Sequence, residues 1–249
     1  MLSKMTSRAR TAAAICLLLA SCQSTIDRSV SARAERRETN LAFTIENNLL
    51  RLTTATVDGR EGRFFLGTAQ PRSVVQPAFA PEQPRRLTLT ISSRDSFEVE
   101  PIYMNLGVVG DAIIGFDAWE DRAVTIDYVA GMVTVHKTPI ETAGMALFRF
   151  QDEPAIALLA NGRRVPAAID TAIPDSLILP RGTSPAGRAS MRIEIAGIDF
   201  GMVDVALADV SRARIGNRLL SKFLVSIDYG SRQAGLWRDP RVELGTTRP

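Results

Sequence analysis

The chain has 249 residues, of which 45% are apolar and 23% are charged, so a packed globular core is expected. This length suits one large domain or two small ones. The formal net charge is +3, and three of the positive charges (Lys4, Arg8 and Arg10) lie in an N-terminal segment that we expect to be removed. The mature chain would then carry no net charge, which argues against nucleic acid as a partner and against electrostatic binding to anionic lipid.

The N-terminal segment has the three parts of a secretory signal peptide, which we assign to residues 1–21. Its basic part precedes the apolar run Thr11–Ala20, which is too short to span a bilayer, and small residues follow. The sequence Leu-Ala-Ser-Cys ending at Cys22 resembles the bacterial lipobox, which implies cleavage before Cys22 and its lipidation. The alternative is an ordinary signal peptide with a chance cysteine.

The lipobox resemblance also implies a location. It predicts a protein of the bacterial cell envelope that faces the periplasm and is attached to the membrane through Cys22. Gln23 after the cysteine fits the outer membrane if the host has that sorting machinery. The other cysteine, Cys16, lies within the signal peptide, so the mature chain has no cysteine pair and its stability must come from its core. Residues 22–40 are polar and lack apolar periodicity, which predicts a flexible tether.

From Leu41 onward the pattern is typical of an all-β protein, because short alternating runs are separated by Gly, Pro, Asn and Asp. Asp58-Gly59 and Asn161-Gly162 predict tight hairpins. The expected strands are 49–57, 63–66, 86–91, 97–104, 123–128, 132–136, 155–159, 165–169, 177–179, 191–195, 202–207, 224–229 and 233–237. Two short helices are expected, at 116–122 and 217–223.

An internal repeat divides this region into two halves. Residues 66–75 and 169–179 share the pattern Thr-Ala-x-Pro-x-Ser followed by apolar residues, at an offset of 103. Residues 114–128 align without a gap to 215–229, at an offset of 101. The repeat predicts a first lobe at 41–138, a linker at 139–149, a second lobe at 150–238 and a polar tail at 239–249.

The repeated segments resemble the retropepsin-like aspartic proteases and their pepsin relatives. That family carries an apolar strand into Asp-Thr-Gly-Ala-x-x-Ser and, after a flap hairpin, an apolar-apolar-Gly motif. The matching residues are Asp170, Thr171, Ser176 and Gly216 in the second half, and Thr68, Ser73 and Gly115 in the first. The resemblance implies an all-β fold of two pseudo-symmetric barrel lobes around a central cleft, with flap-like hairpins near Thr90–Glu98 and Ile195–Gly201.

The resemblance also implies a chemistry, from which this sequence departs. In the family, one Asp from each lobe shares a proton with the other, and the pair act as general base and general acid. Here Gly67 stands at the first of these positions, so Asp170 is the one candidate catalytic carboxylate that remains. Ala172 replaces a Gly and would be strained if φ were positive there. Thr68 and Thr171 are both retained, and the family pattern implies that their hydroxyls support the paired loops.

Other chemistries find little support in the sequence. His136 is the one histidine, no Gly-x-Ser-x-Gly motif accompanies it, and we interpret it as structural. One histidine and no free cysteine in the mature chain argue against a transition-metal site, so no metal or cofactor is expected, although a carboxylate calcium site stays open. Trp119 and Trp237 are expected in the core, and Asp175 in solvent. The Arg212–Arg218 loop is interpreted as a solvated face, with the rim of a cleft as the alternative.

Three functions remain compatible with these patterns. We favour a non-catalytic, monomeric envelope lipoprotein whose inter-lobe cleft binds an extended peptide or a protein by strand addition. The second is an active aspartic peptidase that uses Asp170 with an acid supplied by dimerisation or from elsewhere in the chain. The third is a structural lipoprotein with a closed cleft. An Asp at position 67 would have decided for the enzyme.

Overall fold

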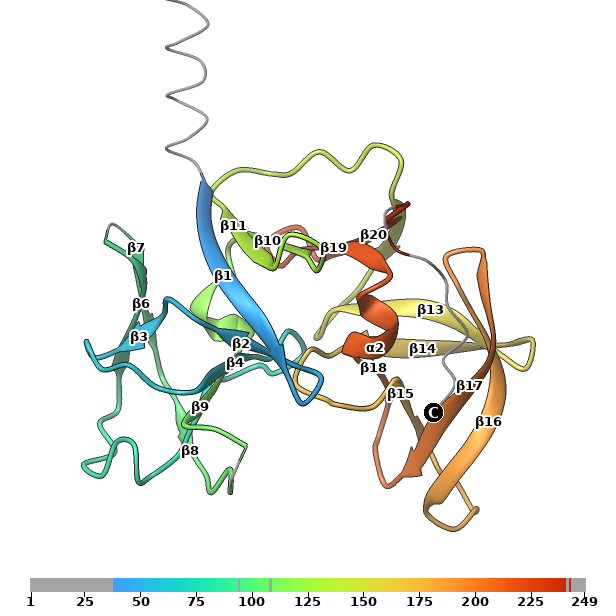
Figure 1. Ribbon diagram of the computed structural model, residues 1–249, viewed down its shortest axis with the longest axis horizontal. Coiled ribbons are helices and arrows are strands. Elements are labelled where there is room, and N and C mark those ends of the chain that lie inside the picture. Colours follow the sequence, from blue (N-terminus) through green and yellow to red (C-terminus); the bar gives the residue numbers. More distant parts are fainter. Residues whose placement is uncertain (1–37, 94, 108, 241, 243–249) are drawn as a thin grey trace, which may run out of the picture. The chain divides into compact units, whose positions relative to one another are not determined.

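The computed structural model describes residues 38–93, 95–107, 109–240 and 242 (Figure 1). Residues from Thr39 onward belong to one compact unit, and the fold is nearly all-β, as the sequence pattern predicts. The predicted signal peptide, Cys22, most of the tether and most of the tail lie outside the described residues. Within the described part of the chain, no helix has the length and apolar character needed to cross a membrane.

The strands are short and follow one another with brief connections. They are β1 (Glu38–Glu46), β2 (Leu49–Leu52), β3 (Thr56–Val57), β4 (Phe64–Leu66), β5 (Val74–Val75), β6 (Leu87–Ser92), β7 (Asp95–Val99), β8 (Ile102–Tyr103), β9 (Ala112–Ile114), β10 (Ala123–Asp127), β11 (Met132–His136), β12 (Ala146–Arg149), β13 (Ala155–Ala160), β14 (Arg163–Ile169), β15 (Leu177–Pro180), β16 (Gly187–Ile195), β17 (Ile198–Ala208), β18 (Ala213–Ile215), β19 (Phe223–Asp228) and β20 (Gln233–Arg238). The helices are a 3-10 turn, η1 (Phe116–Ala118), and α2 (Asn217–Leu220), both shorter than expected.

The strands form three sheets. Strands β13, β14, β18, β15, β17 and β16 close a six-stranded barrel, all from the second half. An 11-stranded sheet runs β12-β20-β19-β10-β11-β1-β2-β4-β9-β5-β8, and so contains strands of both halves. Strands β3, β6 and β7 form a separate three-stranded sheet. The second half therefore closes a barrel whereas the strands of the first half lie in open sheets, so the predicted pair of barrel lobes is not confirmed. The two halves share the 11-stranded sheet.

Equivalent segments of the repeat nevertheless pair in the same way. In the first half β4 runs parallel to β9, and in the second half β14 runs parallel to β18. Each pair brings the loop after the first strand beside the Ile-Gly sequence that follows the second. Strands β10 and β19 are antiparallel neighbours in the shared sheet, where Thr125 lies directly opposite Ser226, its counterpart in the repeat.

Local sequence explains the hairpins and the buried faces. Asp58 and Gly59 have φ of 49° and 72°, and Asn161 and Gly162 have φ of 48° and 77°, which confirms both predicted turns. Strand β6 alternates buried and half-buried positions, so its apolar side chains enter the core and its polar ones face outward. Strand β13 alternates in the same way.

Several strand boundaries differ from the sequence-based expectation. The segment 49–57 breaks into β2 and β3, and 97–104 breaks at Pro101, which cannot donate a ladder hydrogen bond. Strand β1 begins within the predicted tether, and β12 lies within the predicted linker. The expected list also lacks β5, β9 and β18, which are two or three residues long and gain their hydrogen bonds from distant partners. Trp119 is buried as expected, but Trp237 is 37% exposed.

Both predicted flap regions are hairpins, but neither is free at its tip. Asp95, at the start of β7, accepts a hydrogen bond from Thr39 and pairs with Lys137 at 2.5 Å, which ties the first hairpin to the shared sheet. In the second hairpin, the end of β16 pairs with β13 and so belongs to the barrel wall. These attachments do not fit hairpins that open and close over a cleft.

Gly115 and Gly216, the glycines of the two Ile-Gly sequences, lie where backbone approaches backbone. A Cβ at Gly115 would lie 2.6 Å from the carbonyl oxygen of Gln70, and one at Gly216 would lie 2.1 Å from that of Asp175. Neither position leaves room for a side chain. The glycine is therefore needed so that the loop between each pair of strands can pack against the chain after the second strand.

Replacing Gly216 with alanine is expected to lower the free energy of unfolding by more than about 2 kcal/mol, because the carbonyl in its way is backbone and cannot turn aside. Gly187→Ala is the matched control, since a Cβ at Gly187 meets no atom within 4 Å. Urea denaturation of both variants measures the difference. Equal midpoints would show that the close approach at Gly216 does not constrain the fold.

Candidate functional site

Two loops, 67–73 after β4 and 170–176 after β14, meet through their threonines, and we call them the loop pair. Thr68 Oγ1 donates to the carbonyl of Ile169 at 2.6 Å, and Thr171 Oγ1 donates to the carbonyl of Leu66 at 2.6 Å. Each hydroxyl also accepts from the backbone N–H of the other threonine, at 3.2 Å in both directions. Both threonines are fully buried. The contact that the family resemblance implies between them is therefore present.

Side chains of the second repeated segment, 114–128 and 215–229, donate hydrogen bonds that support the loop pair. Tyr229 donates its hydroxyl to the carbonyl of Thr68 at 3.0 Å. Asn217 donates its amide to the carbonyl of Thr171 at 2.8 Å, and its own oxygen accepts from Tyr128 at 2.8 Å. Burial raises the pKa of both tyrosines, so each stays a hydrogen-bond donor. Each half thus supplies the tyrosine that supports the loop of the other half.

The two serines of the repeat hold their loops through different atoms, Ser73 through its side chain and Ser176 through its backbone. Ser73 accepts from the backbone N–H of Gly115 at 3.0 Å and donates to Asp117 at 2.8 Å, which ties its loop to η1. Burial raises the pKa of Asp117 despite the two hydrogen bonds from Ser73. Ser176 is buried, and its backbone carbonyl accepts from the N–H of Gly216 at 3.0 Å. Both serines therefore anchor their loops to the Ile-Gly sequences.

Asp170, the candidate catalytic carboxylate, is almost enclosed, with 6% of its side chain exposed. Its Oδ2 accepts from Arg214 Nη1 at 2.6 Å, and its Oδ1 accepts from the backbone N–H of Ala172 at 2.9 Å. Both oxygens are therefore engaged within the chain. A guanidinium at this distance forms a charge-assisted hydrogen bond that compensates the carboxylate within the chain.

Arg214 is the residue of this site that sequence reasoning missed. It lies on β18 between the buried residues Ala213 and Ile215, and it also approaches Glu153 at 3.7 Å. Glu153 in turn pairs with Arg212 at 3.2 Å. The Arg212–Arg218 segment is therefore not simply a solvated face, because two of its arginines join a charge network that ends at Asp170. An arginine between two buried apolar residues was the available signal.

The first loop lacks a carboxylate, and a side chain at Gly67 would require its neighbours to shift. A Cβ at Gly67 would lie 2.7 Å from Ile113 Cγ2 and 3.1 Å from Gln70 Cβ. Since φ at Gly67 is not positive, the backbone is not the obstacle; the neighbouring side chains are. The strain expected at Ala172 does not arise either, because its φ is not positive.

Two other sequence expectations can be compared with the structure. Asp175 is not free in solvent, because it pairs with Arg188 of β16 at 2.9 Å. The imidazole Nε2 of His136 lies 2.9 Å from Thr125 Oγ1, which itself lies 3.1 Å from Ser226 Oγ, so the histidine belongs to a polar chain across the shared sheet. Among the described side chains, no group of three or more His, Cys, Asp or Glu could hold a metal ion.

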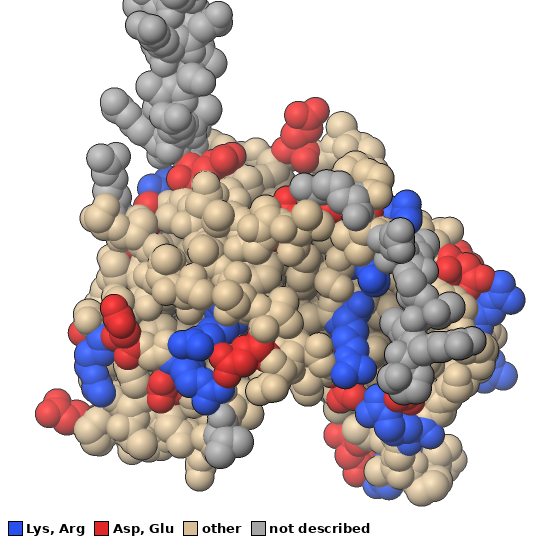
Figure 2. Space-filling view, in the orientation of Figure 1, with Lys and Arg blue, Asp and Glu red and all other residues tan. Residues whose placement is uncertain are grey.

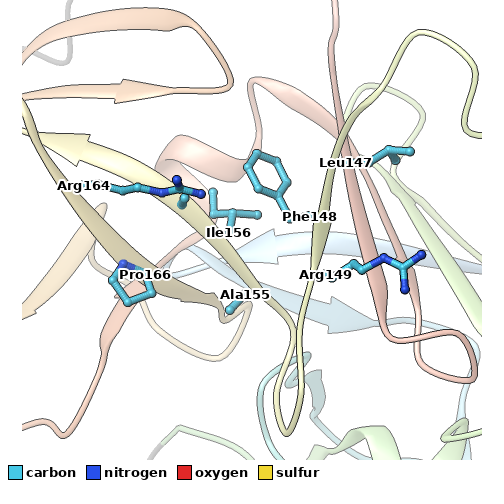
Figure 3. Close-up of a pocket in the computed structure, with 8 residues that line it drawn as sticks. Leu147, Phe148, Arg149, Ala155, Ile156, Arg164 and Pro166 are labelled. Carbon is cyan, nitrogen blue, oxygen red and sulfur yellow. The ribbon is translucent and has the colours of Figure 1, made fainter.

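Three pockets of the structure can be described, and the loop pair lines none of them. The largest of the three, about 500 Å³, lies between β12 and the β13–β14 pair (Figure 3). The other two, about 190 and 320 Å³, adjoin the segment 137–142 and the end of β19. On the face drawn in Figure 2, basic and acidic side chains are interspersed rather than gathered by sign.

The chain was compared with protein-family models and with curated proteins. No protein-family model matches it, and no curated protein matches it. The site therefore has to be interpreted from its own geometry, in which one enclosed carboxylate with a hydrogen bond to each oxygen lies beside the loop pair.

Thr68→Val and Thr171→Val are each expected to cost about 2–4 kcal/mol of unfolding free energy, because each leaves a buried carbonyl and a buried amide without a partner. The double variant should cost less than the sum, since the loops separate once either contact is lost. Thr134→Val, which removes an exposed hydrogen bond to Asn40, should change stability by no more than about 0.5 kcal/mol. Chemical denaturation measures the unfolding free energy of the two single variants, the double variant and the Thr134→Val control. Strict additivity would mean that the two threonines act independently.

Proposed function

We propose that this protein is a non-catalytic, peptide- or protein-binding envelope lipoprotein, built on a two-lobed, retropepsin-like framework that has lost one catalytic Asp. The observation that carries the proposal is the state of Asp170, whose two oxygens are held by Arg214 and by the amide of Ala172. The hydrogen bonds between the two threonines and the bond from Tyr229, which the family pattern would need around the carboxylate, support the framework part of the proposal.

The charge balance at the site also supports a binding role. Aspartic proteases need two carboxylates that share one proton, so that one accepts and the other donates. Here position 67 supplies none, and its neighbours fill the space a side chain would use. A guanidinium compensates Asp170 instead of a second acid. This arrangement suits a structural ion pair better than proton transfer.

The alternative is an active aspartic peptidase that obtains its second acid by dimerisation. In a homodimer the second halves would have to pair with each other across chains. That would require breaking the hydrogen bonds between Thr68 and Thr171, which already join the two halves within one chain. The interlocked loops therefore favour the monomer and the binding function.

The mature chain, residues 22–249 carrying Cys22→Ser, is expected to cleave no peptide in a diverse mixture incubated between about pH 3 and pH 7. Asp170→Asn should give the same products as the parent, namely none, and an unrelated aspartic protease in the same mixture provides the positive control. Mass spectrometry reads the products. Cleavage that disappears in Asp170→Asn would overturn the binding proposal and establish the peptidase.

We further propose that the mature chain is attached to the envelope through a lipid on Cys22, as the lipobox resemblance implies. Cells expressing the full chain should incorporate labelled palmitate into it and retain it in the membrane fraction. The Cys22→Ser variant should take up no label and appear in the soluble periplasmic fraction. Release of both forms as soluble, unlabelled protein would identify an ordinary signal peptide.

A further inference from the structure

The free edge of β12 combines features of a strand-binding surface. Among the described strands, β12 is the last of the 11-stranded sheet and forms its ladder with β20, while β13 follows it nearby without pairing to it. The backbone N–H of Phe150 donates to Arg232 just beyond the strand, and hydrogen-bonded positions alternate in an antiparallel pair. The N–H and C=O groups of Leu147 and Arg149 therefore point away from β20, toward the free edge.

The largest of the described pockets lies along this edge. Its residues are Leu147, Phe148 and Arg149 of β12 together with Ala155, Ile156, Ala157, Arg164 and Pro166 of the β13–β14 pair. Ala157 lies opposite Pro166 in the ladder, so the two side chains lie on the same face of the barrel wall. Together with Ala155 they form a shallow surface of small side chains beneath the pocket. In Figure 3 the ring of Phe148 extends from β12 toward the β13–β14 pair, whereas Ile156 is 2% exposed and belongs to the core. An added strand would therefore find apolar surface below it and backbone groups beside it.

Two arginines beside the β12 edge favour an added strand that carries acidic residues. Arg164 lies on the pocket side, and Arg149 projects from the opposite face of β12 (Figure 3). Neither arginine has an ion-pair partner among the residues that the structure describes. A strand beside β12 would present alternate side chains to these two faces, so acidic residues on it would meet an arginine on either side.

We propose that the free edge of β12 binds an extended, acidic segment of a partner protein, which adds as a strand next to Leu147 and Arg149 and places its acids near Arg149 and Arg164. This inference rests on the binding function proposed above and gives it a location away from the loop pair. Main-chain hydrogen bonds would supply affinity, and the arginines would supply selectivity.

The test is selection of displayed random eight-residue peptides on the mature chain carrying Cys22→Ser. We expect enrichment of peptides with Asp or Glu, bound about tenfold more weakly by Leu147→Pro and by Arg164→Glu. Leu147→Pro removes a free-edge N–H that β20 does not use, and a proline is tolerated at such a position. Leu147→Val keeps that N–H, and Arg163→Glu changes charge on the other face of β14, so both should bind like the parent.

Three results would overturn the proposal: no enrichment, enriched peptides without acids, or binding that neither Leu147→Pro nor Arg164→Glu weakens. Circular dichroism would show whether Leu147→Pro is folded. If it is not, the comparison of peptide affinity between Arg164→Glu and its control Arg163→Glu tests the proposal by itself. Peptide binding that is unchanged in both variants would show that the peptide does not bind at β12, and it would still support the binding function proposed above. Hydrolysis of the selected peptides that depends on Asp170 would instead remove the binding function itself.

Discussion

The reciprocal hydrogen bonds between Thr68 and Thr171 are the constraint on which the centre of the molecule depends. They join loops 103 residues apart in the sequence and are fully buried, so each donor and acceptor must find its partner in the other half. Tyr229 and Asn217 satisfy the carbonyls that the threonines leave open. A network of this kind is stable when every member is paired, which explains why both halves contribute to it.

The same network determines what Asp170 can do. Once the loops are fixed, the carboxylate is enclosed beside β18, where Arg214 is the cation within reach. An enclosed carboxylate needs such a partner, since burying a lone charge is costly. The ion pair is thus a consequence of keeping the acid in a rigid site without a second acid.

The sharing of one sheet by both halves has a consequence at its edge. Strands β10 and β19 join the halves, β20 extends the sheet, and the segment between the halves adds β12 as the last strand. That connecting segment therefore does more than link two units. Among the described strands, its backbone groups at Leu147 and Arg149 lie at the edge of the sheet beside a pocket, and sheet edges of this kind are sites where other chains add.

Local patterns in the sequence determined the all-β class, the tight turns at Asp58-Gly59 and Asn161-Gly162, most longer strands and the repeat that brings Thr68 and Thr171 into equivalent positions. These follow from side-chain alternation and from φ preferences, which depend on neighbouring residues. The tertiary structure alone decided that Arg214 pairs with Asp170, that side chains fill the space at Gly67, that both predicted flaps are held and that β12 ends a sheet. Each of these depends on which strands pair across distant parts of the chain, and periodicity within a single strand does not specify its partner.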